Sequence, residues 1–227
     1  MHARLPLRMN FHVLLAATLV CATLVFLPSC GEKDYNAREA RQAFEAWQNA
    51  YSSSDTKTIA DMCQKDTIDR YTRLIPIALA FGKREEIRAM SNADKYEVLF
   101  MRAMVPRKEL LKMDGRAYVE YMARIGHTMD PRKRMLPIMR VRATDDYADI
   151  TLKAEANGQA ATTFRLVRVG DRWLFDERDR LQAIEQELSG SPRTVSSETD
   201  RAFVRGLGTV AGLTDRDLTD VWDRCIR

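Results

Sequence analysis

Histidine is scarce in this chain, and the common sequence motifs of catalysis are missing. The 227 residues include three histidines, and only His127 follows the amino-terminal apolar segment. One histidine excludes a multi-histidine metal site and most catalytic triads that do not use it. No glycine-rich phosphate loop, paired-cysteine metal motif or nucleophile elbow occurs. We therefore expect no metal site and no cofactor, and the sequence leaves any catalytic residue unknown.

Acidic residues are absent from the amino terminus, where none precedes Glu32. Arg4 and Arg8 come before an apolar run over 11–27, and this order is typical of a signal peptide. The run is shorter than the roughly 20 residues that a spanning helix needs. We predict a lipoprotein signal peptide over residues 1–29. The alternative is an uncleaved membrane anchor.

The apolar run ends in Leu27-Pro28-Ser29-Cys30-Gly31. This segment resembles the lipobox of bacterial lipoproteins, although Pro28 replaces the small or hydroxyl residue usual there. The resemblance implies cleavage before Cys30, lipid on that cysteine, and attachment to a membrane. Gly31 rather than aspartate implies the periplasmic side of the outer membrane in a bacterial cell envelope. Residues 30–36 are then expected to be a polar tether.

The remaining chain has a small net charge and few cysteines. Loss of Arg4 and Arg8 lowers the formal net charge from +4 to +2, which argues against a nucleic-acid partner. Beyond Cys30 the chain has two cysteines, Cys63 and Cys225. An oxidising envelope favours one disulfide between them. The alternative is two buried free thiols.

Helical spacing dominates the first two-thirds of the chain. Ala37, Phe44, Trp47 and Tyr51 predict an amphipathic helix over 35–51. The next helices are expected after an N-cap at Asp55, over 67–81 with a kink at Pro76, after the Ser91-Asn92-Ala93-Asp94 capping box, and between Asp114 and Gly126.

The pattern changes after Pro131 to short alternating segments. Strands are predicted at 138–143, 147–156, 161–169 and 173–175. Asn157-Gly158 and Gly170-Asp171 favour tight turns, so we expect an antiparallel meander. Beyond a short helix over 181–188, residues 189–197 predict a linker and 198–227 a helical tail. This tail packs back onto the domain, or it docks a partner.

Two segments carry a resemblance to a known fold. Residues 44–55, Phe-Glu-Ala-Trp-Gln-Asn-Ala-Tyr-Ser-Ser-Ser-Asp, and residues 170–176, Gly-Asp-Arg-Trp-Leu-Phe-Asp, resemble the nuclear-transport-factor-2-like superfamily. The resemblance implies an α+β cone over 37–188, with a curved antiparallel sheet and a helical insertion at about 83–127. It also implies a pocket inside the cone, for which the candidate lining residues are Phe44, Trp47, Tyr51, Tyr71, Phe164 and Trp173.

The function that we expect is non-enzymatic, because no position matches a catalytic acid–base motif of this superfamily closely. The chain would bind a small ligand, or serve as a scaffold for an envelope protein partner or a homodimer. The alternative is an isomerase or dehydratase with an acid–base residue in the pocket. That enzyme would need a buried, unpaired aspartate beside a tyrosine or His127, although His127 also fits a charge at a helix C-terminus. Candidates are Asp55, Asp66, Asp69, Tyr71, Tyr118, Tyr121 and Tyr147.

Overall fold

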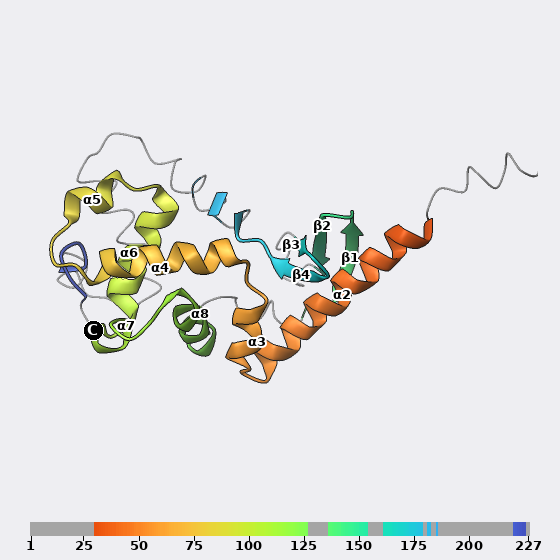
Figure 1. Cartoon of the computed structure of the whole chain (residues 1–227), viewed down its shortest axis with the longest axis horizontal. Helices are drawn as coiled ribbons and strands as arrows, with labels where there is room; N and C mark the ends of the chain where they lie inside the picture. Colours follow the sequence, from red (N-terminus) through yellow and green to blue (C-terminus); the bar gives the residue numbers. More distant parts are fainter. Residues whose placement is uncertain are drawn as a thin grey trace, which may run out of the picture.

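The computed structural model describes residues 30–126, 136–153, 161–178, 181, 182, 185 and 220–225. Helices come first and a sheet follows, so the α+β class is confirmed (Figure 1). The helices are α2 (Cys30–Ser52), α3 (Thr56–Asp61), α4 (Lys65–Leu79), α5 (Arg84–Ala89), α6 (Asn92–Met104), α7 (Arg107–Leu110) and α8 (Gly115–Arg124). The strands are β1 (Ile138–Ala143), β2 (Tyr147–Leu152), β3 (Thr163–Val169) and β4 (Arg172–Phe175).

Helix α2 begins at Cys30, which corrects the prediction of a tether over 30–36. Asn36 is only 2% exposed, and its amide donates to Asp145 Oδ1 at 2.9 Å. Arg168 of β3 donates in turn to Asn36 Oδ1 at 2.7 Å. The predicted tether is therefore the first part of α2. The amino-terminal end of α2 projects away from the sheet (Figure 1).

The four strands form the predicted meander, with neighbours paired antiparallel in the order β1-β2-β3-β4. Between β3 and β4, Val169 pairs with Arg172 and Gly170 has a φ of +64°. A two-residue turn needs positive φ here, as expected from Gly170-Asp171. The predicted turn at Asn157-Gly158 lies outside the described residues.

Three predicted N-caps, at Asp55, Ser91 and Asp114, are confirmed. The side chains of Asp55, Ser91 and Asp114 accept from the backbone N–H groups three residues later, at 2.8 to 3.1 Å. In the predicted capping box, the carboxylate of Asp94 instead accepts from Arg70 Nε at 2.7 Å. Asp94 therefore uses its side chain for a tertiary contact between α6 and α4 instead of for the local capping box.

The buried apolar residues of the described ranges form two hydrophobic clusters. The sheet lobe consists of α2, α3 and the sheet, with Phe44, Ile150 and Leu166 fully buried. The helical lobe consists of α4 to α8, with Val98, Leu99 and Phe100 fully buried. The described part of the predicted insertion at about 83–127 thus forms a core together with α4. Figure 1 shows these two groups of elements on opposite sides, with α8 between them.

The carboxy-terminal segment packs back onto the helical lobe. Val221 and Trp222 are 0% and 6% exposed within its core, so the end of the predicted tail docks on its own chain. Residues 221–223 form turns where helix was predicted. Gly82 N donates to Asp223 O at 2.8 Å, which holds the segment at the end of α4. The predicted linker over 189–197, and residues 198–219 of the tail, lie outside the described residues.

The prediction of a disulfide between Cys63 and Cys225 is wrong, because both thiols are free. Cys63 lies just before α4 and donates to Ile59 O at 3.6 Å. Cys225 donates to Ala78 O, near the other end of α4, at 3.5 Å. The helix between these positions spans about 20 Å, whereas a disulfide allows about 7 Å between Cα atoms. The alternative of two free thiols is the correct one, and both are half-buried rather than buried.

Candidate functional site

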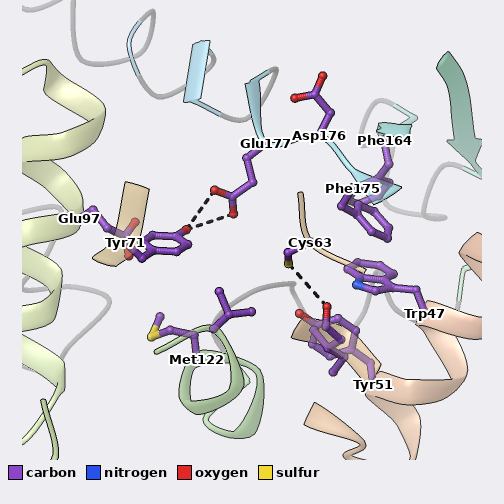
Figure 2. A pocket seen from close by; sticks show the side chains of 12 residues that line it. Trp47, Tyr51, Cys63, Tyr71, Glu97, Met122, Phe164, Phe175, Asp176 and Glu177 are labelled. Carbon is purple, nitrogen blue, oxygen red and sulfur yellow. Dashed lines mark hydrogen bonds between the residues drawn. The ribbon is translucent and has the colours of Figure 1, made fainter. Parts of the chain in front are cut away.

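A cavity of about 120 Å³ lies where the sheet lobe meets the helical lobe (Figure 2). Its wall includes residues from α2, α3, α4, α6, α8, β3 and β4. The lining residues among those described are Trp47, Tyr51, Ile59, Cys63, Tyr71, Glu97, Val119, Met122, Phe164, Phe175, Asp176 and Glu177.

Aromatic rings from the sheet lobe form one wall of the cavity. Trp47 lies 4.2 Å from Phe175 and 4.6 Å from Tyr51, measured between ring centroids. Trp47 and Tyr51 are one helical turn apart on α2, and Phe164 reaches the same cluster from β3 at 5.9 Å from Trp47. Such tilted and edge contacts add about 1 kcal/mol each to the burial of the rings.

The helical lobe supplies the opposite wall, which contains a buried carboxylate. Glu97 of α6 is 3% exposed. The hydroxyl of Tyr118 on α8 donates to Glu97 Oε1 at 2.6 Å. Val119 and Met122, on the same helix, add apolar surface beside this pair. A buried carboxylate needs such a donor, because an unsatisfied charge in an apolar site is costly.

Two further carboxylates stand where the chain leaves β4. The Tyr71 hydroxyl lies 3.1 Å from both carboxylate oxygens of Glu177 (Figure 2). Asp176 forms an ion pair with Arg178 at 2.7 Å. Burial would raise the pKa of Asp176, but hydrogen bonds from the side chain and backbone of Arg178 outweigh it, and the pKa is lowered. Asp176 is therefore ionised at neutral pH.

Cys63 lies between the aromatic and acidic sides of the cavity (Figure 2). Burial, together with the nearby charge of Glu177, raises the pKa of the Cys63 thiol to about 12. Nucleophilic cysteines need the thiolate, so this thiol is unsuited to covalent catalysis at neutral pH. Its position is fixed because Phe175 N donates to Met62 O at 2.8 Å.

Four of the six predicted pocket residues line the cavity: Trp47, Tyr51, Tyr71 and Phe164. The prediction was wrong for Phe44 and Trp173. Phe44 is fully buried behind the wall, 5.4 Å from Trp47 between ring centroids. Trp173 is 5% exposed and stacks under the guanidinium of Arg168 at 5.7 Å. Both residues fill the sheet core instead.

The sequence analysis did not predict the other lining residues, which are Ile59, Cys63, Glu97, Val119, Met122, Phe175, Asp176 and Glu177. Phe175 could have been found, because it follows Trp173 by two residues and so shares its face of β4. Burial of Glu97 could also have been predicted, because this acidic residue directly precedes the apolar run Val98–Met101. Nothing in the sequence indicated the position of Glu177, because only the path of the chain after β4 brings it to Tyr71.

The candidate acid–base residues are mostly spread over the surface. Asp55 caps α3, and Asp55, Asp66, Asp69 and Tyr147 are exposed. Tyr71 lines the cavity, Tyr118 bonds to one of its carboxylates, and Tyr121 is half-buried. His127 lies outside the described residues.

No protein-family model, curated protein or solved structure matches this chain. Within the described ranges, no cluster of three or more potential metal ligands occurs. None of the described helices has both the length and the apolar character to cross a membrane.

Proposed function

We propose that this chain is a lipid-anchored envelope protein that binds a small, largely apolar molecule in the cavity between its lobes. The cavity carries the proposal: Trp47, Tyr51, Phe164 and Phe175 come from the sheet lobe, and Tyr71 and the buried Glu97 come from the helical lobe. Ligand sites are commonly concave and apolar with a few fixed polar groups. A volume of about 120 Å³ limits the enclosed part of the ligand to a single ring, because a cavity of roughly 150 Å³ holds benzene.

The cone fold of the nuclear-transport-factor-2-like superfamily is part of this proposal. Its support is the order of elements: a long aromatic helix, a short capped helix, and then an antiparallel meander. The aromatic residues of α2 pack against Phe164 and Phe175 on one face of the sheet. A separate helical core beside the cone supplies the second wall of the cavity.

Binding is favoured over the alternative of an isomerase or dehydratase. That chemistry requires a buried, unpaired aspartate in the cavity. The aspartate lining the cavity, Asp176, is paired with Arg178 and has a lowered pKa. A carboxylate with a lowered pKa is a weaker base and is ionised at neutral pH, so it neither accepts nor supplies protons readily.

The binding proposal predicts that a single-ring compound enters the cavity of the wild-type protein in lipid nanodiscs. We expect at least one member of a small panel, 2-phenylethanol, 2-phenylethylammonium and phenylacetate, to shift the Trp47 indole N–H signal in NMR titrations. Empty nanodiscs correct for partition into lipid. Val119→Phe should weaken the response at least tenfold, since the added ring occupies the cavity.

Val141→Phe is the matched control for this experiment. Val141 is half-buried on β1 and does not line the cavity, so the same change in side chain should leave the titration unaltered. If no member of the panel shifts the Trp47 signal, the proposed binding function is contradicted. Equal weakening by both variants would also contradict it.

The anchor proposal predicts that protein purified from membranes begins at Cys30 and carries the mass of acyl chains. Its measurement is intact mass spectrometry under non-reducing conditions, and Cys30→Ser should remove both the cleavage and the acyl mass. The mass should show no loss of two hydrogens, because Cys63 and Cys225 are free. An uncleaved chain without acyl mass would contradict the anchor.

The helical start of α2 sets the height of the cavity above such an anchor. Trp47 follows Cys30 by seventeen residues of continuous helix. At 1.5 Å per residue these span about 25 Å. The anchored protein would therefore present the cavity about 25 Å along α2 from the lipid.

A further inference from the structure

The amino-terminal part of α2 is fixed to one end of the sheet. Asn36 donates to Asp145, in the turn between β1 and β2, and accepts from Arg168 near the end of β3. The turn between β3 and β4 lies at this same end, because neighbouring strands are antiparallel. We call this part of the sheet, residues 143–147 and 168–172, the turn end. The bonds of Asn36 hold the start of α2 beside it.

Large apolar side chains are exposed at the turn end and beside it. Tyr147 and Val169 are 41% and 53% exposed, and Tyr35, directly before Asn36, is 53% exposed. Tyr147 pairs with Val167, and Val169 lies two residues farther along β3, so Tyr147 and Val169 are diagonal neighbours on one face of the sheet. None of the three exposed residues belongs to either hydrophobic cluster of the described ranges. They are therefore available to a surface outside the chain.

The proposed lipid on Cys30 brings the turn end close to a bilayer. Tyr35 and Asn36 follow Cys30 by five and six residues of continuous helix, which span about 7 to 9 Å along the axis. The headgroup layer on each side of the hydrocarbon core is roughly 5 to 8 Å thick. Acyl chains hold Cys30 at the inner boundary of this layer, so the headgroups reach nearly to Tyr35 even when α2 stands upright. A tilt of α2 closes the remaining distance.

The charged residues at the turn end limit how deeply it can enter a bilayer. Asp146 and Asp171 in the turns and Arg142 and Arg172 on the strands are all exposed. Charged side chains are costly in hydrocarbon, so the contact must stay within the headgroups. Tyrosine suits this layer, because its ring is apolar and its hydroxyl is polar. Zwitterionic headgroups carry both signs of charge, as this end of the sheet does.

We propose that the turn end, together with Tyr35, is a membrane-contact surface that rests on zwitterionic lipid headgroups around the lipidated Cys30. This inference rests on the proposed lipid anchor and adds a second contact, which fixes the orientation of the chain on the bilayer. Figure 1 shows α5, α6 and α7 at the end of the molecule opposite to the start of α2. The sheet lobe therefore faces the bilayer, and the helical lobe projects away from it.

The test measures which residues approach the headgroups when the protein purified from membranes is placed in phosphatidylcholine nanodiscs. A small fraction of the lipid carries a gadolinium chelate on its headgroup, and matched discs carry a diamagnetic lutetium chelate. We expect the amide NMR signals of Tyr35, Tyr147 and Val169 to broaden at least fivefold more than those of Phe81 and Leu111. These two reference residues are 80% and 56% exposed but follow α4 and α7 in the helical lobe.

A double variant, Tyr147→Ser with Val169→Ser, removes two apolar side chains of this surface and leaves both hydrophobic clusters intact. It should lower the broadening at the amides of Ala148 and Gly170 at least twofold, because the turn end no longer gains from contact with the lipid. Met139→Ser is the matched control. Met139 is 59% exposed at the start of β1, which is the opposite end of the sheet, so its substitution should leave the broadening unchanged.

The intact mass of the same sample separates failure of the surface from failure of the anchor. Equal broadening at Tyr147 and Phe81, in protein that carries the acyl mass, would overturn the membrane-contact surface and leave the anchor intact. Protein without acyl mass would overturn both proposals. Broadening that is unchanged in the double serine variant would also overturn the inference, because these side chains would not be what holds the turn end at the lipid.

Discussion

Arg102→Met is expected to lower the free energy of unfolding by about 4 kcal/mol, the largest single-residue effect that we anticipate for this chain. Arg102 is fully buried. It donates to six backbone carbonyls, at 2.6 to 3.3 Å except for a shorter bond to Trp222: Ile77, Ala78, Ala80, Gly82, Val221 and Trp222.

The bonds of Arg102 join three parts of the helical lobe. Four of the carbonyls belong to the end of α4 and the loop after it, where the negative end of the helix dipole favours a cation. The other two belong to Val221 and Trp222, so Arg102 holds the carboxy-terminal segment in place. Burial lowers the pKa of Arg102, yet the guanidinium stays charged because arginine is not deprotonated in proteins.

Methionine fills a similar volume but leaves all six carbonyls without this donor. Urea unfolding followed by tryptophan fluorescence measures the loss of stability. Hydrogen exchange at Gly82 N–H, which donates to Asp223 O, measures release of the terminal segment. Arg102→Lys should recover only part of the loss, because an ammonium lacks the planar fork of donors.

Arg116→Met is the matched control for Arg102. Arg116 is 40% exposed and pairs with Asp61 and Glu120 on the surface. Exposed ion pairs contribute about 0 to 1 kcal/mol, so this variant should unfold almost as the wild type does. If Arg102→Met costs no more than Arg116→Met, the carboxy-terminal segment is held by Trp222 packing rather than by the buried guanidinium.

Gly115→Ala is expected to destabilise the protein by about 3 kcal/mol and to weaken ligand binding in the cavity. A Cβ at Gly115 would lie 2.0 Å from Ile68 O and 2.8 Å from Thr72 N. Both are backbone atoms of α4, so the only relief is to move α8 away from α4. Val119 and Met122 of the cavity wall would move with α8.

Gly82→Ala is the control that distinguishes the effect of a steric clash from the effect of backbone strain. Gly82 has a φ of +73° and no heavy atom within 4 Å of an added Cβ, so its substitution carries a conformational cost of about 1 kcal/mol and no clash. Thermal and urea unfolding of both variants, together with the probe titration, make the comparison. A Gly115→Ala protein as stable as Gly82→Ala would show that α4 and α8 are not packed as closely as described.

The helix caps show how far local sequence reaches. Asp55, Ser91 and Asp114 cap helices because each bond joins residues three apart, which the sequence places together without help from the rest of the chain. The same holds for Gly170, whose positive φ suits the turn between β3 and β4. The order of the meander follows from such short connections.

Cys63 and Cys225 show where that reasoning stops. The presence of two cysteines in a predicted oxidising compartment favoured a disulfide, but α4 keeps the two thiols at opposite ends of the helical lobe. Asn36 is a similar case, because a polar residue in a polar segment gives no sign that Asp145 and Arg168 will bury it. The number of residues between two positions does not show whether they are in contact in the folded chain.

The sequence by itself determined the α+β class, the order of the strands, the helix caps and the aromatic face of α2, because these depend on periodicity and on bonds between near neighbours. Only the tertiary structure decided that the helices form a second core, that Arg102 joins the terminal segment to it, and that Glu97 and Glu177 face the aromatic wall. These features depend on residues far apart in the sequence, and burial and charge act between them only after the two lobes have packed together.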